Sequence, residues 1–598
     1  MRDHGRSSSS GVSVLVTWSE FNGEYALEQE LLDMLMPLAI QDALPALIRF
    51  LRFGDAGSAS RFHLLDENIQ GLFRNNLGRW VGAQLSSRPE RVFFTRWQLL
   101  AAIKLVCTFG ATGDGVGQVR PLQLLDLLLM VNDFVHRDFG DSGPLETFEQ
   151  QVVSVKGQAL KGNMLLHHEP PLGLIGRYSD LLGSRAGIQN SNHFRSWLDI
   201  DLVASSTMGV GIADFRSLLF SVYASLPNTR ELRMGETVQL FDFSEEQNEQ
   251  ELPFCFDPES WFVNTSLSRE VLTRGLDLVT CSPEQIRGEH NAKYGQGVGR
   301  LFDLGLLLRK PIIKLADGCL AGLSTYLVVQ RYTSGLYWDI HDSLPDDSSV
   351  IPNRRLFQTF FGELHEDYGR DVLRRMTQHQ SKSGRRAYLY DEGDYSTGPG
   401  KNPDNVLVEI IGRKNIRCTF FEFKVGRPRY DASLVTGDLS AFQEDLEQKI
   451  GAGLGQEVEL CRDLLNGTRG LDDFSAQDVK QWFFVIVVTD PFPALAMMLD
   501  SLQIQMSELP QSTGVKYHGP FVLSLLDLEQ LETLMPHRVS ELLIEWEAGP
   551  CKGLPFGSFY WARTKDAPKM NEHVKRLGDH ALDFAAASLV ENMEAKTT

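Results

Sequence analysis

The sequence predicts a three-layer α/β domain in the C-terminal half of the chain, preceded by a large and mostly α-helical region. From residue 354 to about residue 535, the apolar patterns follow the order helix, strand, hairpin, helix, buried strand, strand, helix. That order is typical of a mixed sheet with helices on both faces. Before about residue 305, apolar residues recur mainly at helical spacing, which predicts the helical region.

Length and composition exclude several classes of protein. With 598 residues, of which 42% are hydrophobic and 23% charged, the chain is long enough for several buried cores. The net charge of −20 argues against a surface that coats nucleic acid without specificity. The seven cysteines are scattered singly, and no apolar run is long enough to cross a bilayer. We therefore expect a cytoplasmic protein without a zinc site, a disulfide framework or a membrane partner.

Changes in sequence texture suggest four segments. Around Pro311, short apolar runs at 312–315, 326–331 and 336–340 predict strands, and residues 342–353 are rich in Pro, Asp and Ser. The predicted organisation is a helical region at 1–305, a small strand-rich segment with a linker at 306–353, an α/β domain at 354–560 and a polar tail at 561–598. The helical region contains no convergent catalytic motif, so we expect it to sense or regulate.

One glycine-rich stretch of the helical region invites comparison with phosphate-binding loops. Residues 295–299 read Gly-Gln-Gly-Val-Gly. No strand precedes them, and no Lys-Ser or Lys-Thr pair follows them, so the sequence assigns this stretch no function.

The chemistry of the α/β domain is predicted at a hairpin. Residues 406–411 and 416–424 are rich in β-branched and aromatic residues and flank a short polar turn. Because side chains alternate along a strand, Glu422 and Lys424 point to one face while Phe421 and Phe423 point to the other. Asp404 lies at the start of the first strand of the hairpin. Two carboxylates and one ammonium are therefore expected at one edge of the sheet, where the carboxylates could hold a hard divalent cation.

Pro403-Asp404 followed by Glu422-Phe423-Lys424 resembles the signature of the PD-(D/E)XK nuclease superfamily. The chain contains at least two other (D/E)-x-K triplets, and those at 447–449 and 478–480 lie in polar contexts that would not line a sheet edge. The resemblance implies a restriction-endonuclease-like fold for the C-terminal domain. It also implies that Asp404, Glu422 and the backbone carbonyl of Phe423 bind Mg²⁺, or alternatively Mn²⁺, and that Lys424 positions water or stabilises the transition state.

The resemblance suggests further site residues without deciding between them. A helix predicted over residues 354–376 would precede the site strands and contribute an acid, either Glu363 or Glu366. The helix predicted over 439–465 would contribute a glutamine, either Gln443 or Gln456. Basic residues also cluster around the motif in the sequence, and three of them are the candidates for contacts with nucleic acid: Arg413, Arg427 and Arg429.

The function expected from these residues is that of a magnesium-dependent endonuclease, a hydrolase of phosphodiester bonds. DNA is favoured over RNA as the substrate, and defence of a bacterium against viral or other foreign DNA is the role suggested by analogy at the level of the fold. The alternative is a catalytically inactive nuclease-like module that binds nucleic acid or supports assembly. The sequence leaves open whether other proteins or further copies of the chain are partners.

Overall fold

A computed structural model gives the fold of the chain. It describes residues 14–583 except for 56–61, 89–90, 113–120, 140–168, 188–193, 227–254, 302, 347–351, 396–401, 413–414, 427–428, 430–434, 436–437, 472–473, 490–491, 493–498, 511–513 and 566–568.

The largest sheet lies in the C-terminal half and has five strands in the order β11-β10-β9-β8-β7. Its strands are β7 (Arg386–Asp391), β8 (Asn405–Gly412), β9 (Asn415–Lys424), β10 (Val479–Val488) and β11 (Lys516–Ser524). Neighbours from β7 to β9 are antiparallel, whereas β9, β10 and β11 run parallel. The predicted hairpin and the predicted buried strand are therefore confirmed.

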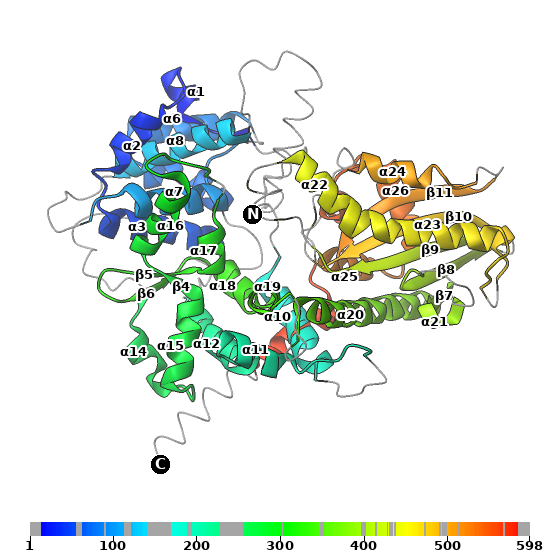
Figure 1. Ribbon diagram of the computed structural model, residues 1–598. Coiled ribbons are helices and arrows are strands. Elements are labelled where there is room, and N and C mark those ends of the chain that lie inside the picture. The colour runs from blue at the N-terminus through cyan, green and yellow to red at the C-terminus, as the bar shows by residue number, and fades with distance from the viewer. Residues whose placement is uncertain are drawn as a thin grey trace.

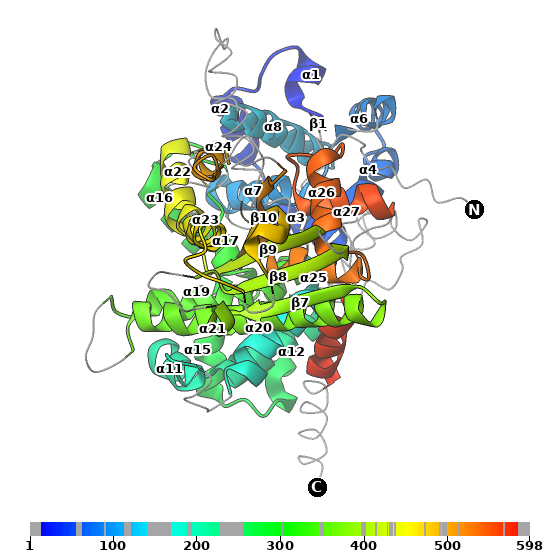
Figure 2. The ribbon, with the colours of Figure 1, turned by 90° about the vertical axis from the view of Figure 1, so that its right-hand side faces the viewer.

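Helices cover both faces of this sheet (Figure 1 and Figure 2). Phe421 and Phe423 of β9 belong to the core that contains the apolar stripe of α20. Phe420 belongs instead to the core that contains the apolar residues of α22 and α23. The first face is covered by α20 (Arg354–Lys382), α25 (Leu525–Thr533), α26 (Val539–Ala548) and α27 (Phe556–Thr564), and the second by α22 (Leu439–Leu446), α23 (Ala452–Leu465) and α24 (Asp500–Met506).

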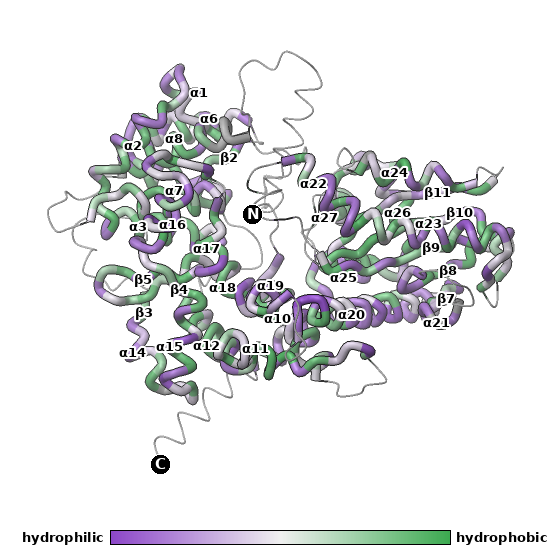
Figure 3. The backbone as a smooth tube through the Cα atoms, viewed as in Figure 1, coloured by the Kyte–Doolittle hydropathy of each residue, from purple (hydrophilic) through white to green (hydrophobic). Residues whose placement is uncertain are grey.

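Helix α20 packs directly on the strand that carries the motif. Its predicted apolar stripe is buried, and its hydropathy alternates along the helix (Figure 3). At Gly369 the helix comes so close to β9 that an added Cβ would collide with the ring of Phe423. A glycine at this position therefore sets the distance between α20 and the sheet.

The N-terminal half is mostly helical, as predicted. A core separate from the two that cover the large sheet contains apolar residues from Val16 to Val131 and from Cys281 to Leu327. The helices are α1 (Trp18–Asn22), α2 (Glu28–Leu35), α3 (Ile40–Gly54), α4 (Phe62–Glu67), α5 (Ile69–Leu72), α6 (Asn76–Ser87), α7 (Arg96–Phe109), α8 (Pro121–Phe139), α10 (Pro171–Ser179), α11 (Ile200–Met208), α12 (Ile212–Ser225), α14 (Pro258–Trp261), α15 (Arg269–Val279), α16 (Pro283–Tyr294) and α17 (Gly305–Arg309), with a π-helical segment at Asp180–Arg185.

Two small sheets accompany these helices. The pair β1 (Val14–Leu15) and β2 (Arg91–Val92) is parallel. The other sheet has the order β3-β6-β5-β4 and joins β4 (Thr280–Cys281) to β5 (Ile312–Lys314). Its remaining strands are β3 (Cys255–Phe256) and β6 (Leu320–Gly322). This sheet therefore pairs residues on both sides of the boundary predicted at 305. In the described part of the chain, no helix combines the length and the apolar character needed to cross a membrane.

The strands predicted at 326–331 and 336–340 are wrong, because both segments are helical. They lie in α18 (Thr325–Arg331) and α19 (Ser334–Ser343). Short apolar runs rich in aromatic and β-branched residues fit a strand and a buried helix equally well. A capping signal was present: the hydroxyl of Ser324 accepts a hydrogen bond from the Leu327 N–H at 3.2 Å, and such a cap marks the start of a helix. Among the described residues of 306–353, the end of α17 is thus followed by two short strands and then by two helices.

The core beneath α20 extends across the boundary predicted at 354. It includes residues from Leu174 to Leu344 together with residues from Phe357 to Tyr560. Within it, the Arg177 guanidinium of α10 donates to the carboxylates of Glu169 and Glu529, and the Tyr368 hydroxyl of α20 also donates to Glu529. Because Arg177 and Glu529 are each 3% exposed, this pair is shielded from water. Breaking a buried pair by removing one partner typically costs about 3–5 kcal/mol.

The end of the described chain also packs on this region. Residues 572–583 are helical, and Val574 is fully buried. The side-chain amide of Asn571 donates to Glu532 at 2.8 Å, and Gly176 of α10 lies against the Val574 carbonyl. The part of the predicted tail that the structure describes is therefore attached to both halves.

The glycines of α20 give a direct test of its packing. We expect Gly369→Ala to lower the free energy of unfolding strongly, because its methyl group would enter the space of the Phe423 ring. The matched control is Gly362→Ala, where a Cβ meets nothing within 4 Å. That change should stabilise the helix by up to about 1 kcal/mol. Chemical denaturation of both variants measures the difference, and equal stabilities would contradict the close approach.

Stability should also fall on acidification because of His365. Burial, reinforced by Arg177, lowers the pKa of this histidine from 6.5 to about 4. Its Nδ1 donates to the Phe361 carbonyl at 2.8 Å, and Nε2 has no partner among the described residues, so a second proton would have no acceptor. Between pH 6.5 and about 4 the unfolded chain binds a proton that the folded chain does not, which costs about 3 kcal/mol across that range.

The variant His365→Asn isolates this effect, because asparagine does not titrate and its amide can still donate to the Phe361 carbonyl. We expect the free energy of unfolding of the wild type to fall more steeply with decreasing pH than that of the variant. Thermal unfolding at a series of pH values measures both slopes, and parallel slopes would rule out His365 as the cause.

Candidate active site

Asp404 lies at the mouth of the hairpin, next to the end of β9. The antiparallel register pairs Asn405 with Phe421, so the residue before Asn405 lies opposite Glu422. The Phe423 N–H donates a hydrogen bond to the Asp404 carboxylate at 2.7 Å. This bond fixes the carboxylate beside the backbone that joins Glu422 to Lys424.

Glu422 and Lys424 form an ion pair under α23. The Lys424 ammonium donates to Oε1 of Glu422. The other carboxylate oxygen of Glu422 is buried and has no hydrogen-bond partner within the described residues. Since 27% of the Lys424 side chain is exposed, compared with 2% for Glu422, the pair is reached by solvent only from the lysine side. The structure thus brings Asp404, Glu422 and Lys424 together at one end of β9.

The two candidate acids on α20 have different surroundings. The carboxylate of Glu363 accepts a hydrogen bond from the Ser196 N–H at 3.1 Å and so holds the N-terminal half. Glu366 lies close enough to Lys424 for the two charges to act on each other. Of the two, Glu366 is the acid that α20 brings to the site.

Of the other predicted residues, Gln443 and Arg429 contact residues outside the motif, Gln456 lies on α23, and two arginines are outside the described residues. The Gln443 amide donates to Glu447 and to Ser501. Gln456 lies on α23 and is half-buried. The Arg429 guanidinium pairs with Asp445 and Glu444. Arg413 and Arg427 are outside the described residues.

Several of the other basic residues near the site in sequence also contact acids. Arg370 and Arg374 of α20 pair with Asp391. Arg375 of the same helix pairs with Glu532. These three guanidinium groups are therefore partly neutralised within the fold.

Sequence reasoning missed Glu457, a residue of α23. Its side chain is fully buried, Oε1 accepts a hydrogen bond from the Val485 N–H at 3.3 Å, and Oε2 has no partner among the residues described. A signal was available, because Glu457 falls within the apolar stripe of the helix, beside Leu454, Val458 and Cys461. A carboxylate at such a position is rarely buried without a role.

Burial dominates the electrostatics of the cluster. It raises the pKa of Asp404 well above the usual value, and the charges of Glu422 and Glu366 add to this effect. Burial raises the pKa of Glu422 to about 7, although Lys424 opposes the shift. Burial alone would lower the pKa of Lys424, but the neighbouring carboxylates, above all that of Glu422, outweigh it and raise that pKa. Carboxylates that resist ionisation together would gain from a bound cation.

The donor set suits a hard cation with few protein ligands. Within the described ranges, no group of three or more His, Cys, Asp or Glu side chains is placed to hold a metal ion. Mg²⁺ commonly uses only one or two carboxylates and completes its shell with water and phosphate oxygens. Asp404 and Glu422 can supply two such oxygens, and the unpartnered Oε2 of Glu422 is available for this purpose.

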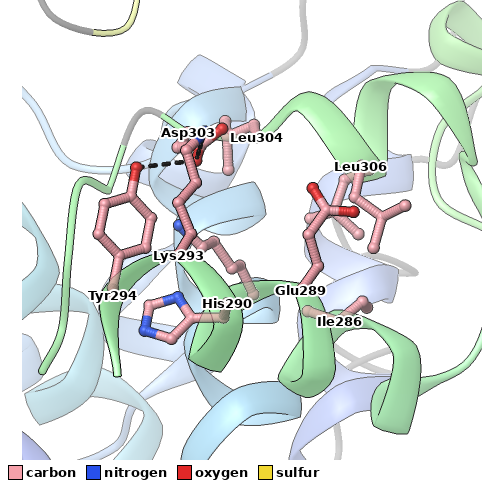
Figure 4. A pocket seen from close by; sticks show the side chains of 10 residues that line it. Ile286, Glu289, His290, Lys293, Tyr294, Asp303, Leu304 and Leu306 are labelled. Carbon is pink, nitrogen blue, oxygen red and sulfur yellow. Dashed lines mark hydrogen bonds and ion pairs between the residues drawn. The ribbon is translucent and has the colours of Figure 1, made fainter. Parts of the chain in front are cut away.

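A small pocket lies in the N-terminal half, away from this cluster, between α16, α7 and α17 (Figure 1). Lys104, His290, Lys293 and Asp303 line it, and a hydrogen bond joins the Tyr294 hydroxyl to Asp303 (Figure 4). Its volume of about 20 Å³ admits about one water molecule.

The glycine-rich stretch follows α16 directly. There the Val298 N–H donates to the Glu28 carboxylate at 2.7 Å. A carboxylate therefore takes a backbone donor that a phosphate loop would offer to its ligand, and the stretch remains without an assigned function.

Comparisons with protein-family models, with curated proteins and with solved structures found no match to this chain.

Proposed function

We propose that this protein is a metal-dependent nuclease that hydrolyses phosphodiester bonds in DNA, and that its C-terminal domain has a restriction-endonuclease-like fold. One observation carries the proposal: Asp404, Glu422 and Lys424 meet at one end of β9, with Glu366 close by on α20. The sheet with helices on both faces, and the order of the elements in the chain, support it further.

Each residue has a distinct part in this proposal. Asp404 and Glu422 hold Mg²⁺ or Mn²⁺, with the Phe423 carbonyl as a backbone ligand. A cation bound there lowers the pKa of its water and neutralises charge on the phosphate. The Lys424 ammonium would donate hydrogen bonds to the attacking water or to a phosphate oxygen. Glu366, on α20, would act on the charge of Lys424.

The role of the N-terminal half in this proposal is to recognise a target or a partner. Its Arg185 pairs with Asp367 of α20, and its Arg177 pairs with Glu529, which also accepts the Tyr368 hydroxyl of α20. Helix α20 also carries Glu366. A role in defence against foreign DNA is compatible with this arrangement and rests on analogy at the level of the fold.

A non-catalytic module that binds nucleic acid or supports assembly is the second candidate function. The observation that favours it is the ion pair itself, because Lys424 takes one oxygen of Glu422. Metal binding separates the two candidates, since a non-catalytic module has no need of a cation.

Cleavage by the full chain tests the proposed function. We expect DNA to be cut in the presence of Mg²⁺ or Mn²⁺ and to remain intact in EDTA. Lys424→Ala should slow the cleavage step by about a hundredfold or more, because a positioned charge at the reacting phosphate is lost. Asp478→Asn is the matched control, since it alters an exposed acid in another (D/E)-x-K triplet.

Single-turnover measurements on single- and double-stranded DNA and RNA give the substrate preference as well as these rates. Cleavage by Lys424→Ala at the wild-type rate would replace the proposed nuclease by the non-catalytic module.

Metal affinity should respond differently to the acids and to the lysine. Asp404→Asn and Glu422→Gln remove negative charge, so Mg²⁺ should bind more weakly. Lys424→Ala removes a positive charge that competes for Glu422, so affinity should stay equal or rise. Calorimetric titration at a pH well above 7, where protonation of Glu422 no longer competes, measures all three. Weaker binding by Lys424→Ala would show that the lysine supports the metal site rather than opposing it.

A further inference from the structure

Helix α23 touches both charged residues of the motif through a glycine. A Cβ built on Gly453 would lie 3.0 Å from Cγ of Glu422 and 3.1 Å from Cε of Lys424. Real Cβ contacts are seldom this short, so any side chain at position 453 would push on the pair. The backbone of α23 therefore forms a wall of the candidate site on the face opposite α20.

One turn further along, Glu457 ties the same helix to the sheet. Its Oε1 accepts the Val485 N–H, at the point where the register between β10 and β11 shifts. Val485 neighbours Ile486, which lies directly beside Glu422 in the parallel register. The hydrogen bond from Val485 to Glu457 thus holds α23 against β10, the strand next to the motif. We call this bond the tie, and it fixes the distance between the α23 backbone at Gly453 and the side chains of Glu422 and Lys424.

We propose that Gly453 and Glu457 are positioning residues of the active site. Gly453 leaves the space into which Glu422 and Lys424 extend, and Glu457 keeps the width of that space constant. This inference rests on the proposed nuclease function and adds two residues that the sequence motif does not contain.

A role in packing alone would have different consequences. If Gly453 served only the contact between helix and strand, its replacement would change stability and leave chemistry unchanged. Gly455 lies in the same helix, and a Cβ there meets only Oε1 of Gln505, at 3.9 Å, an ordinary contact. Alanine at 455 therefore reproduces the change in helix propensity without the push on the ion pair.

The experiment compares full-length Gly453→Ala and Gly455→Ala. Misplacing reacting groups by about 1 Å can cost about a hundredfold in rate, and a shift of a few tenths of an ångström should cost about tenfold. We expect Gly453→Ala to lower kcat about tenfold with KM unchanged and to weaken Mn²⁺ binding, measured by calorimetry without nucleic acid. Gly455→Ala should match the wild type in all three quantities.

Two further variants test the hydrogen bond between Glu457 and Val485. They also keep the proposal testable if Gly453→Ala does not fold. Glu457→Gln keeps an oxygen that can accept the Val485 N–H, so its kcat should stay near that of the wild type. Glu457→Met has similar length without an acceptor, and its kcat should fall about tenfold. Circular dichroism and thermal unfolding establish that each variant is folded.

The possible outcomes distinguish a failure of the positioning role from a failure of the proposed nuclease function. If the wild type cuts DNA while Gly453→Ala cuts equally fast, or if both alanine variants slow equally, the positioning role is refuted and the nuclease function stands. Equal rates for Glu457→Gln and Glu457→Met would refute the tie. If the wild type neither cuts nor binds Mn²⁺, the nuclease proposal fails, and the positioning role fails with it.

Discussion

The ion pair between Glu422 and Lys424 lies under a helix, in a sheet that is covered on both faces. Strand alternation turns Phe421 and Phe423 toward α20, so the residues between and after them must face α23. Burial of the Glu422 carboxylate carries a desolvation cost. The Lys424 ammonium offsets this cost only in part, because the pKa of Glu422 is still raised. Pairs of this kind rarely stabilise a fold better than apolar residues of similar size. The position of this pair at the end of a largely buried strand favours a functional explanation over a structural one.

Helix α20 connects this pair to the rest of the molecule. Three consecutive residues have separate contacts: Glu366 acts on Lys424, Asp367 pairs with Arg185, and Tyr368 donates to Glu529. Close packing of Gly369 on Phe423 means that a displacement of the helix is transmitted to β9. The N-terminal half and the candidate site therefore both act on helix α20, within three consecutive residues of it.

Local pattern predicted most of the C-terminal sheet and the three residues of the motif. Strands β8, β9 and β10 are long, strongly apolar or alternating, and bounded by turn residues, so their type is clear from sequence. Helices α18 and α19 were mistaken for strands because each contributes only a short apolar run to a core built from distant segments.

Contacts between distant residues were beyond prediction. The choice between Glu363 and Glu366 could not be made from the sequence. Glu363 accepts a hydrogen bond from the backbone N–H of Ser196, a residue that lies far away in the sequence. The basic residues near the motif in the sequence suggested a positively charged surface that would bind the phosphates of nucleic acid. Their pairing with Asp391, Glu532 and Asp445 involves acids spread along the chain, and charge counting along the sequence does not reveal such partners.

The shared core beneath α20 limits how this protein could be divided or recombined. A fragment that began at residue 354 would carry Glu529 without the guanidinium of Arg177 and would expose apolar residues that pack against the segment from Leu174 to Leu344. The smallest portable unit that keeps this core intact must therefore include the chain from about Glu169 onward. The C-terminal α/β domain is therefore not structurally independent of the helical region. A chimaera that transferred the sheet to another chain would have to include α10 as well.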